Sequence, residues 1–338
     1  MIDMEKIQQL IKILQKIEQQ PYPSHSRIHA LSSFNSSNRC CFVKREDELG
    51  FGISGSKIRK YRTLIPFLIH NKVEEVVVIG SAYSNHVLSF LQLLIENKIQ
   101  ATLFLRGDPK REFKGNCFFT SLLTPASSIH WFSKEEWRSV LEQANFYAKD
   151  KKNICILPEG ACIPEAFPGA LTLPLDIIQN EADTQLEFNH LFIDSGTGLS
   201  AIALILAYYW IGKKTQIHVV LMAENEAYFL KQLASFHRYF EQLMGTSQLP
   251  FPSNFQLYRP KQGKKFGQLY SHSFKDIIQL ARVEGFFTDP IYTGKLFHES
   301  KKIINSSALE GLILIIHSGG TLSLLAGFQD QLREAFQE

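Results

Sequence analysis

Residues 75–105 of this chain read EVVVIGSAYSNHVLSFLQLLIENKIQATLFL. The apolar run from Glu75 to Ile79 predicts a buried strand, Asn85 to Glu96 predicts a helix, and Ala101 to Leu105 predicts a second strand. A strand, a helix and a strand in this order form a βαβ unit, whose strands run parallel and whose crossover is right-handed. The stretch therefore predicts an α/β fold built on a parallel sheet.

The same alternation recurs on both sides of this stretch. Ile58 to Ile69 is expected to be a helix, and Leu199 to Trp210 a second helix that follows an apolar strand at Leu191 to Asp194. Further strands are expected at Ile217 to Ala223 and Leu312 to Ile316. The fold class predicted is α/β with two doubly wound parallel-sheet domains.

Proline and glycine recur between Leu157 and Pro174, which indicates a domain boundary there. We expect a discontinuous large domain of residues 1–61 and 173–338, and a small α/β domain of residues 62–172. The segment from Met244 to Phe266, rich in Pro, Gly and polar residues, is expected to be a surface excursion.

Composition narrows the class of protein. The chain has 338 residues, is 45% hydrophobic and 20% charged, and carries a formal charge of only +3, which is typical of an ordered globular protein without a nucleic-acid partner. No apolar run is long enough to span a bilayer or to serve as a signal peptide, so we expect a cytoplasmic protein without a membrane partner. Apolar residues at three- and four-residue spacing in the first twenty residues predict an amphipathic helix packed on the body or at a subunit contact.

The five cysteines form no CxxC pair and are expected to be reduced thiols. The eleven histidines show no HExxH or similar ligand spacing. We therefore predict no catalytic metal.

One lysine stands out in Phe51 to Lys60, which reads FGISGSKIRK. Small residues clear space around Lys57 immediately before a predicted helix, and an amine in such a pocket can form a Schiff base with an aldehyde cofactor. The same pattern is also typical of a loop that caps a helix and leaves its cations in solvent.

Four polar, glycine-containing turns accompany predicted strands. Gly80 to His86 (GSAYSNH) places Ser84, Asn85 and His86 beyond a strand end, where ligands bind in open parallel sheets, although Ser84 equally fits a helix cap. Asp194 to Ser200 (DSGTGLS) has the glycines and hydroxyls of a phosphate cup, or of a turn that lets helices pack closely. The other two turns are Thr288 to Lys295 (TDPIYTGK) and Ile316 to Thr321 (IHSGGT).

This ordered set of motifs resembles one enzyme family. KRED (44–47), GSKIRK (55–60), GSAYSNH (80–86), SGTG (195–198), DPIYTGK (289–295) and HSGG (317–320) are similar to the D-cysteine desulfhydrase and 1-aminocyclopropane-1-carboxylate (ACC) deaminase family, from about Pro21 to Gly327. Members of that family are pyridoxal-phosphate enzymes of the tryptophan synthase β-like fold, known as fold type II.

The resemblance implies roles for matching positions. Lys57 would hold the cofactor and act on the substrate α-proton, with Ser84 and Tyr292 as further catalytic residues. Ser84, His86 and Tyr292 would contact the substrate. The implied cofactor contacts are Lys57, Asn85 at the ring hydroxyl, Ser195, Gly196, Thr197, Gly198 and Leu199 around the phosphate, Thr293, and Ser318 at the pyridine nitrogen.

Two positions separate the branches of the family. Deaminases resemble DPVYEGK and HLGG, whereas desulfhydrases resemble DPVYTGK and HTGG, so Thr293 and Ser318 favour the desulfhydrase branch. A neutral hydroxyl near the pyridine nitrogen imposes less protonation than a carboxylate would, and β-elimination of a good leaving group can manage with the weaker electron sink.

Three positions depart from the family pattern. Ser56 stands where the family usually has Asn, Ser81 where it has Gly, and Phe266 where it commonly has Tyr. These departures leave the substrate open.

The leading hypothesis is a pyridoxal-phosphate lyase of a small amino acid, most consistent with D-cysteine, that releases pyruvate, ammonia and sulfide. The alternatives are ACC deamination with Ser84 or Tyr292 as nucleophile, a catalytically weak cofactor-binding protein or amino-acid sensor, and a nucleotide-binding enzyme in which SGTG is the site. We expect a homodimer whose only other partner is the small amino-acid substrate.

Overall fold

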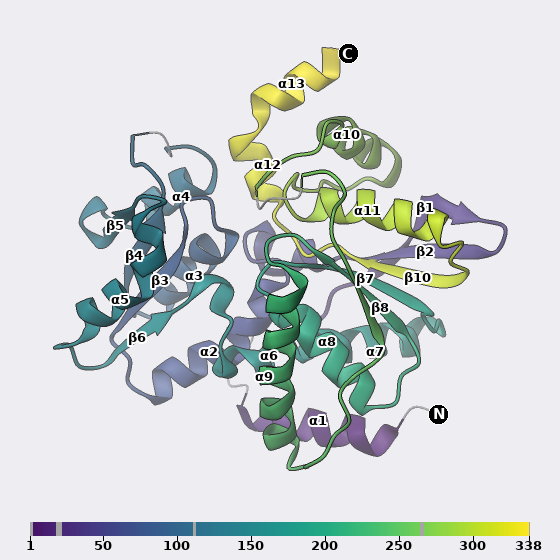
Figure 1. Ribbon diagram of the computed structural model, residues 1–338, viewed down its shortest axis with the longest axis horizontal. Helices are drawn as coiled ribbons and strands as arrows, with labels where there is room; N and C mark the ends of the chain where they lie inside the picture. The colour runs from purple at the N-terminus through teal and green to yellow at the C-terminus, as the bar shows by residue number, and fades with distance from the viewer. Residues whose placement is uncertain (1–2, 18–21, 111–112, 264–266, 338) are drawn as a thin grey trace.

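The computed structural model describes residues 3–17, 22–110, 113–263 and 267–337. Their strands form two sheets (Figure 1). The six-stranded sheet has the order β1 (Ile28–Ser36), β2 (Arg39–Lys44), β10 (Gly311–Ile316), β7 (His190–Ser195), β8 (Gln216–Leu221) and β9 (Phe255–Tyr258). The four-stranded sheet has the order β5 (Ile129–Phe132), β4 (Gln100–Arg106), β3 (Glu75–Ser81) and β6 (Ile154–Leu157).

Helices cover both sheets. The α-helices of the described residues are α1 (Met4–Ile17), α2 (Lys57–His70), α3 (Asn85–Glu96), α4 (Gly115–Leu123), α5 (Val140–Ala148), α6 (Phe167–Ala170), α7 (Thr172–Thr184), α8 (Leu199–Trp210), α9 (Glu226–Met244), α10 (Ser273–Glu284), α11 (Thr293–Ser306), α12 (Thr321–Gly327) and α13 (Gln329–Gln337). In the six-stranded half, α10 and α11 lie on one side of the sheet, and α7, α8 and α9 on the other (Figure 1). The predicted α/β class with two parallel sheets is confirmed.

The predicted elements and the observed ones agree closely. Helices α3 and α8 have the predicted bounds, and β3 and β4 extend the predicted strands by one or two residues. Every strand pair in both sheets is parallel except β1 with β2, which form an antiparallel hairpin at one edge of the larger sheet. The sequence does not predict this antiparallel hairpin.

Strand β9 corrects another expectation. It lies within Met244 to Phe266, which the sequence predicts as a surface excursion, and it pairs with β8 at the other edge of the sheet. The strand has only four residues, and its side chains are only partly buried. A short edge strand of this kind has too little apolar periodicity to be detected in a Pro- and Gly-rich segment.

The N-terminal amphipathic helix packs on the body of the protein, which is one of the two placements predicted from the sequence. Ile7, Leu10 and Leu14 of α1 are buried, and the helix lies against α6 and α9. Burial of one apolar stripe is what keeps a helix of this length ordered.

The arrangement of the sheets positions the functional site. Helix α2 lies between the two halves of the molecule and packs against α3 on one side and α6 on the other (Figure 1). Strands of the four-stranded sheet all fall between Glu75 and Leu157, and those of the six-stranded sheet fall before and after that span. We propose that the domain boundaries follow residues 61 and 172, as the sequence suggests.

Candidate active site

A cavity of about 1100 Å³ lies where the carboxyl ends of the parallel strands of both sheets converge. Residues at or just after strand ends line it: Ser81 of β3, Arg106 of β4, Phe132 of β5, Glu159 beyond β6, Asp194 of β7, Ala223 beyond β8 and Ile316 of β10. This is the edge at which open parallel sheets bind ligands.

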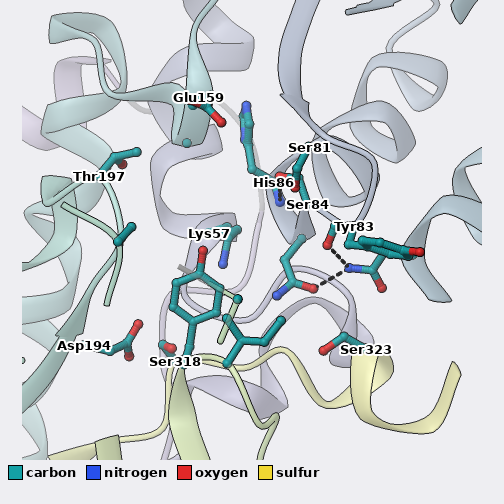
Figure 2. Close-up of a pocket in the computed structure, with 18 of the residues that line it drawn as sticks. Lys57, Ser81, Tyr83, Ser84, His86, Glu159, Asp194, Thr197, Ser318 and Ser323 are labelled. Atoms are coloured by element: carbon teal, nitrogen blue, oxygen red, sulfur yellow. Dashed lines mark hydrogen bonds between the residues drawn. The ribbon is translucent and has the colours of Figure 1, made fainter. Parts of the chain in front are cut away.

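Lys57 is the first residue of α2 and lines this cavity. Burial lowers the pKa of its ammonium, while the carboxylates of Asp194 and Asp289 oppose that shift. Figure 2 shows the lysine among the labelled side chains that point into the cavity. The structure therefore rules out the alternative in which Lys57 extends into solvent.

The turn before Lys57 packs against the turn after β10. The N–H of Ser56 donates to the carbonyl oxygen of Ser318 across 3.0 Å. Gly55 has a φ of +52°, and a Cβ on it would lie 2.3 Å from that same oxygen. Only glycine allows this approach, which brings Lys57 and Ser318 to one cavity.

Asn85 faces the cavity through its amide nitrogen because Asn116 fixes its orientation. Nδ2 of Asn116 donates to the carbonyl oxygen of Tyr83 across 3.1 Å and to Oδ1 of Asn85 across 2.7 Å, as the dashed lines in Figure 2 show. A backbone carbonyl only accepts, so the amide of Asn116 has a single consistent orientation. The free donor of Asn85 is therefore its Nδ2.

The predicted phosphate cup follows β7 and opens on the cavity. Ser195, Gly196, Thr197, Gly198 and Leu199 all line it. Gly198 has a φ of +98° and is the N-cap of α8, so the unpaired N–H groups and positive dipole end of this twelve-residue helix face the same space. The buried hydroxyl of Ser195 has no hydrogen-bond partner among the described residues. These groups suit an anion.

A second lysine, Lys60, lines the cavity one helical turn after Lys57. Its Nζ donates to the carbonyl oxygen of Gly160 across 3.2 Å, and a Cβ on Gly160 would lie 2.5 Å from Oγ1 of Thr197. This ammonium is therefore near the cup. Burial lowers its pKa to about 8, with Cys162 raising and Lys57 lowering it to smaller extents.

Ser84 is the N-cap of α3 and also lines the cavity. Its Oγ accepts hydrogen bonds from the N–H groups of His86 and Val87 across 3.2 and 3.3 Å. Ser84 therefore caps the helix, which is one of the two roles that the sequence suggests for it. The hydroxyl proton is not used by these bonds, because the oxygen is the acceptor in both.

His86 is buried beside Ser84. Burial lowers its pKa to about 3, and the nearby ammonium groups of Lys60 and Lys57 add to that effect, so the imidazole is neutral at physiological pH. Its Nδ1 lies 3.0 Å from the hydroxyl of Tyr61, and its Nε2 has no hydrogen-bond partner among the described residues.

The DPIYTGK turn is organised by Asp289. Its carboxylate accepts from the N–H groups of Ile291, Tyr292 and Thr293 and from the hydroxyl of Thr293, at 2.8 to 2.9 Å. Tyr292 lines the cavity, with ring atoms 3.4 Å or more from the place where a Cβ on Gly196 would lie. Thr293 is fully buried in the turn and is not among the residues that line the cavity.

The structure thus gathers almost every residue that the sequence singles out. The cavity is lined by Lys57, Ser84, Asn85, His86, Ser195, Gly196, Thr197, Gly198, Leu199, Tyr292 and Ser318. Thr293 holds the turn that carries Tyr292, and its implied contact with the cofactor stays a prediction. The departures Ser56 and Ser81 line the cavity as well, whereas Phe266 lies outside the described residues.

Sequence reasoning missed Lys60, Asn116 and Asp194. Lys60 follows Lys57 by three residues in a helix, which is a usable signal because such residues share a face. Asn116 is 31 residues from Asn85, and no local pattern predicts their contact.

The KRED motif lies behind the site rather than in it. Lys44 and Glu46 are buried with Arg59 of α2 and Asp176 of α7. Arg59 donates to Glu46 and to Asp176, each across 2.7 Å, and the Lys44 ammonium also contacts Asp176. This network ties α2, and therefore Lys57, to the larger sheet.

Within the described ranges no helix is both long and apolar enough to cross a membrane. The same residues contain no group of three or more His, Cys, Asp or Glu side chains placed to hold a metal ion.

Known proteins resemble the chain throughout most of its length. No family model matches it. It is 25% identical over 302 residues to the mitochondrial bifunctional D-cysteine desulfhydrase/ACC deaminase of Arabidopsis thaliana. The match covers 84% of this chain and 73% of the Arabidopsis protein. This name joins the two activities of the family that the motifs resemble, so the resemblance is confirmed.

Solved structures agree. A crystal structure of an ACC deaminase homologue matches with a TM-score of 0.83 and 21% identity, over 97% of this chain and 99% of that one. Threonine deaminase isoform 2 from Solanum lycopersicum matches with a TM-score of 0.64 and 14% identity, over 98% and 88%. At this identity the likeness shows the fold, and the predicted fold type II architecture is confirmed.

Proposed function

We propose that this protein is a pyridoxal-phosphate-dependent lyase of a small amino acid, with D-cysteine as the leading substrate and pyruvate, ammonia and sulfide as products. The observation that carries the proposal is the placement of Lys57. Its amine opens on the same cavity as a glycine-rich anion cup and a fixed amide donor from Asn85. Few other cofactors need an amine, an anion cup and a ring-sized space together.

The residues present fit this cofactor. The cup from Ser195 to Leu199 offers unpaired donors at a helix N-terminus, and the ammonium of Lys60 lies nearby to balance a phosphate. Asn85 presents Nδ2 as a donor for the ring oxygen. Bound there, pyridoxal phosphate would supply an aldehyde for attachment to an amine and a ring that withdraws electrons from the substrate α-carbon.

The chain's own groups would then divide the work. Lys57, whose lowered pKa favours the free amine, would bind the aldehyde and later take the proton from the substrate α-carbon. Ser84 keeps its hydroxyl proton available for the substrate. Burial raises the pKa of Tyr292, so its phenol stays protonated and acts as a donor.

ACC deamination is the second candidate. The Arabidopsis relative is named for both activities, and this chain keeps Ser84 and Tyr292 in the cavity as possible nucleophiles for ring opening. The same cofactor and the same lysine serve both reactions, so the two candidates differ only in the substrate.

The first experiment tests the cofactor and its anchor. The full-length protein is incubated with pyridoxal phosphate, reduced with borohydride and digested, and the peptides are mapped by mass spectrometry. We expect the adduct on Lys57. Lys60→Met is the matched control, since it removes the neighbouring amine of the same cavity and should leave the adduct on Lys57. An adduct confined to other lysines would contradict the proposal.

The second experiment decides the substrate. D-cysteine and ACC are assayed side by side, with sulfide and pyruvate measured for the first and 2-oxobutyrate for the second. Sulfide release that disappears in Lys57→Ala supports the leading candidate, and 2-oxobutyrate without sulfide would reverse the choice. Cofactor absorbance that responds to amino acids without any product would instead indicate a sensor.

The cytoplasmic location and the homodimer are part of the same proposal. Sedimentation equilibrium of the cofactor-loaded protein measures the second, with a mass of twice 38.6 kDa as the expected result.

A further inference from the structure

His86 carries a buried ring nitrogen that the proposed work of Lys57, Ser84 and Tyr292 does not use. The residue is 3% exposed and lines the cavity, and Figure 2 labels it next to Ser84. Its Nδ1 is turned to the hydroxyl of Tyr61, whereas Nε2 has no hydrogen-bond partner among the described residues. The nitrogen that carries the proton donates and the other accepts, so the tautomer decides what His86 offers to a ligand.

Three hydrogen bonds behind the cavity form a chain that ends at Nδ1. Oγ of Ser89 lies 2.7 Å from the carbonyl oxygen of Asn85, the Tyr61 hydroxyl lies 2.8 Å from Oγ of Ser89, and Nδ1 of His86 lies 3.0 Å from the Tyr61 hydroxyl. Burial raises the pKa of Tyr61, so its phenol keeps the proton. In the part of the chain that the structure describes, neither Tyr61 nor Ser89 lines the cavity, so a ligand contacts this chain only through His86.

The direction of the chain follows from its carbonyl end. A carbonyl oxygen only accepts, so the single proton of Ser89 belongs to the contact with Asn85. Tyr61 then donates to Ser89, and the Nδ1–H of His86 donates to Tyr61. The reverse direction would leave two oxygens 2.7 Å apart without a proton between them. It would also bury an Nε2–H donor that has no acceptor among the described residues, which is costly.

The neighbouring serine offers the opposite group. Oγ of Ser84 accepts from the backbone N–H groups of His86 and Val87, which occupies both of its lone pairs, so it has only its proton for the cavity. Nε2 of His86 has only a lone pair, and burial lowers the pKa of the ring to about 3, so this nitrogen stays unprotonated. The start of α3 therefore presents one donor and one acceptor.

We propose that Tyr61 and Ser89 are positioning residues that hold His86 as its Nδ1–H tautomer, so that Nε2 accepts a hydrogen bond from a donor on the β-carbon of the substrate. The inference rests on the proposed function and deepens it by naming a substrate class, amino acids with a β-thiol or β-hydroxyl group. Such a group can donate to His86 and accept from Ser84. ACC has only CH₂ groups at these carbons and would leave the buried acceptor unpaired, which disfavours its binding.

The first test observes the tautomer directly and needs no cofactor. The full chain with isotope-labelled histidine is examined by nitrogen NMR, and the signals of His86 are those missing from His86→Phe. In the wild type, Nδ1 should resonate as a protonated nitrogen and Nε2 as an unprotonated one. Ser89→Ala frees the proton of Tyr61 to turn to Nδ1, so it should move the proton of His86 to Nε2.

Tyr61→Phe is a second variant, which removes the acceptor of the Nδ1–H group and should also shift the ring toward the Nε2–H form. Tyr147→Phe is the matched control, since its hydroxyl contacts Thr102 and Glu75 outside the cavity and should leave the signals of His86 unchanged. Thermal unfolding shows whether each variant is folded. A wild type with the proton on Nε2 overturns the inference, and so does a tautomer that neither variant changes.

The second test measures selectivity in the cofactor-loaded enzyme. D-serine and D-2-aminobutyrate differ only by a hydroxyl in place of a methyl group on the β-carbon, and each is used as a competitor of the substrate that the enzyme turns over. D-serine should compete about tenfold better, as for one hydrogen bond to a buried acceptor. His86→Phe keeps a ring without an acceptor and should lose most of that preference.

The outcomes separate the two proposals. A chain that forms no adduct on Lys57 overturns the proposed function and with it the substrate class, whatever the tautomer of His86. An adduct on Lys57 together with a proton on Nε2 of His86, or with equal competition by the two amino acids, overturns the inference alone.

Discussion

The amide of Asn116 donates to Oδ1 of Asn85 across 2.7 Å, and the second proton on the same nitrogen goes to the carbonyl oxygen of Tyr83. The orientation of Asn85, which faces the cavity, is therefore decided by a residue of another helix. Asn116→Asp replaces the donor by an acceptor, so Asn85 would have to turn its nitrogen away from the cavity. We expect the affinity for pyridoxal phosphate to fall about tenfold, as for one lost hydrogen bond.

Cofactor absorbance titration measures this effect. Asn71→Asp makes the same chemical change at the exposed C-terminal cap of α2 and should leave the affinity unaltered. An Asn116→Asp protein that binds the cofactor as tightly as the wild type would show that Asn85 does not need this orientation.

The buried ion network behind α2 predicts a large effect on stability. Arg59→Met leaves the carboxylates of Glu46 and Asp176 with one partner fewer in a dry environment, and the free energy of unfolding should fall by about 3–5 kcal/mol. Arg27→Met removes an ion pair with Glu48 whose side chains are 58% and 36% exposed, and it should cost less than about 1 kcal/mol. Urea unfolding of both variants gives the comparison.

The same network sets an acid limit. Burial opposes the charge on Asp176, but Arg59 and Lys44 hold its pKa below the ordinary 3.8. The stabilisation is therefore fully present above the unfolded pKa and is lost as the pH falls through the lower, folded pKa. Wild-type unfolding free energies measured downward from pH 5 should decrease over that window, and the decrease should be smaller in Arg59→Met.

Lys60 predicts how cofactor binding depends on pH. Its pKa of about 8 means that the ammonium is present at pH 7 and largely lost at pH 9. The phosphate is already a dianion above its second pKa of about 6, so the attraction should weaken as the pH rises through the lysine pKa. Pyridoxal lacks the phosphate and serves as the reference ligand. The ratio of the affinity for pyridoxal phosphate to the affinity for pyridoxal should therefore decrease from pH 7 to pH 9.

Lys60→Met is the control for that ratio. In this variant the affinity ratio should be low and independent of pH over the same range, because the titrating charge is gone. A wild-type ratio that stays constant from pH 7 to pH 9 would exclude Lys60 as a partner of the phosphate.

Gly160 and Gly245 provide a matched pair of glycines. Both have positive φ angles, +67° and +62°, but a Cβ on Gly160 would lie 2.5 Å from Oγ1 of Thr197, whereas nothing lies within 4 Å of a Cβ on Gly245. Both alanine variants should cost about 1 kcal/mol in stability through backbone strain. Only Gly160→Ala should also displace Thr197 from the cup and weaken cofactor binding, which the absorbance titration detects.

The sequence predicts much of this site because most of its members are local to a turn. A strand followed by GSAYSNH or DSGTG places its polar residues at the carboxyl edge of the sheet, whatever surrounds it. Lys57 is the first residue of its helix and is predicted by a local pattern of the same kind. Asn116 escapes such reasoning. Its role depends on a partner 31 residues away, which only helix packing brings into contact.

Ser84 shows why a residue with two roles needs two variants. Its oxygen caps α3, and its proton is free for the substrate. Ser84→Ala removes both roles and should cost about 1 kcal/mol in stability, whereas Ser84→Gly also removes the hydroxyl but costs only a few tenths, because glycine is tolerated at an N-cap. If the hydroxyl transfers a proton in the reaction, both variants should lose kcat by a similar factor, about 10² or more.

A split between the two variants would have a different cause. If Ser84→Gly kept nearly wild-type kcat while Ser84→Ala lost it, the serine would matter only because it starts the helix that carries Asn85 and His86. Steady-state rates with D-cysteine and with ACC, measured beside thermal unfolding of each variant, separate the two roles. The ratio of the two rates should also change if Ser84 is the ring-opening nucleophile, since that step occurs with ACC alone.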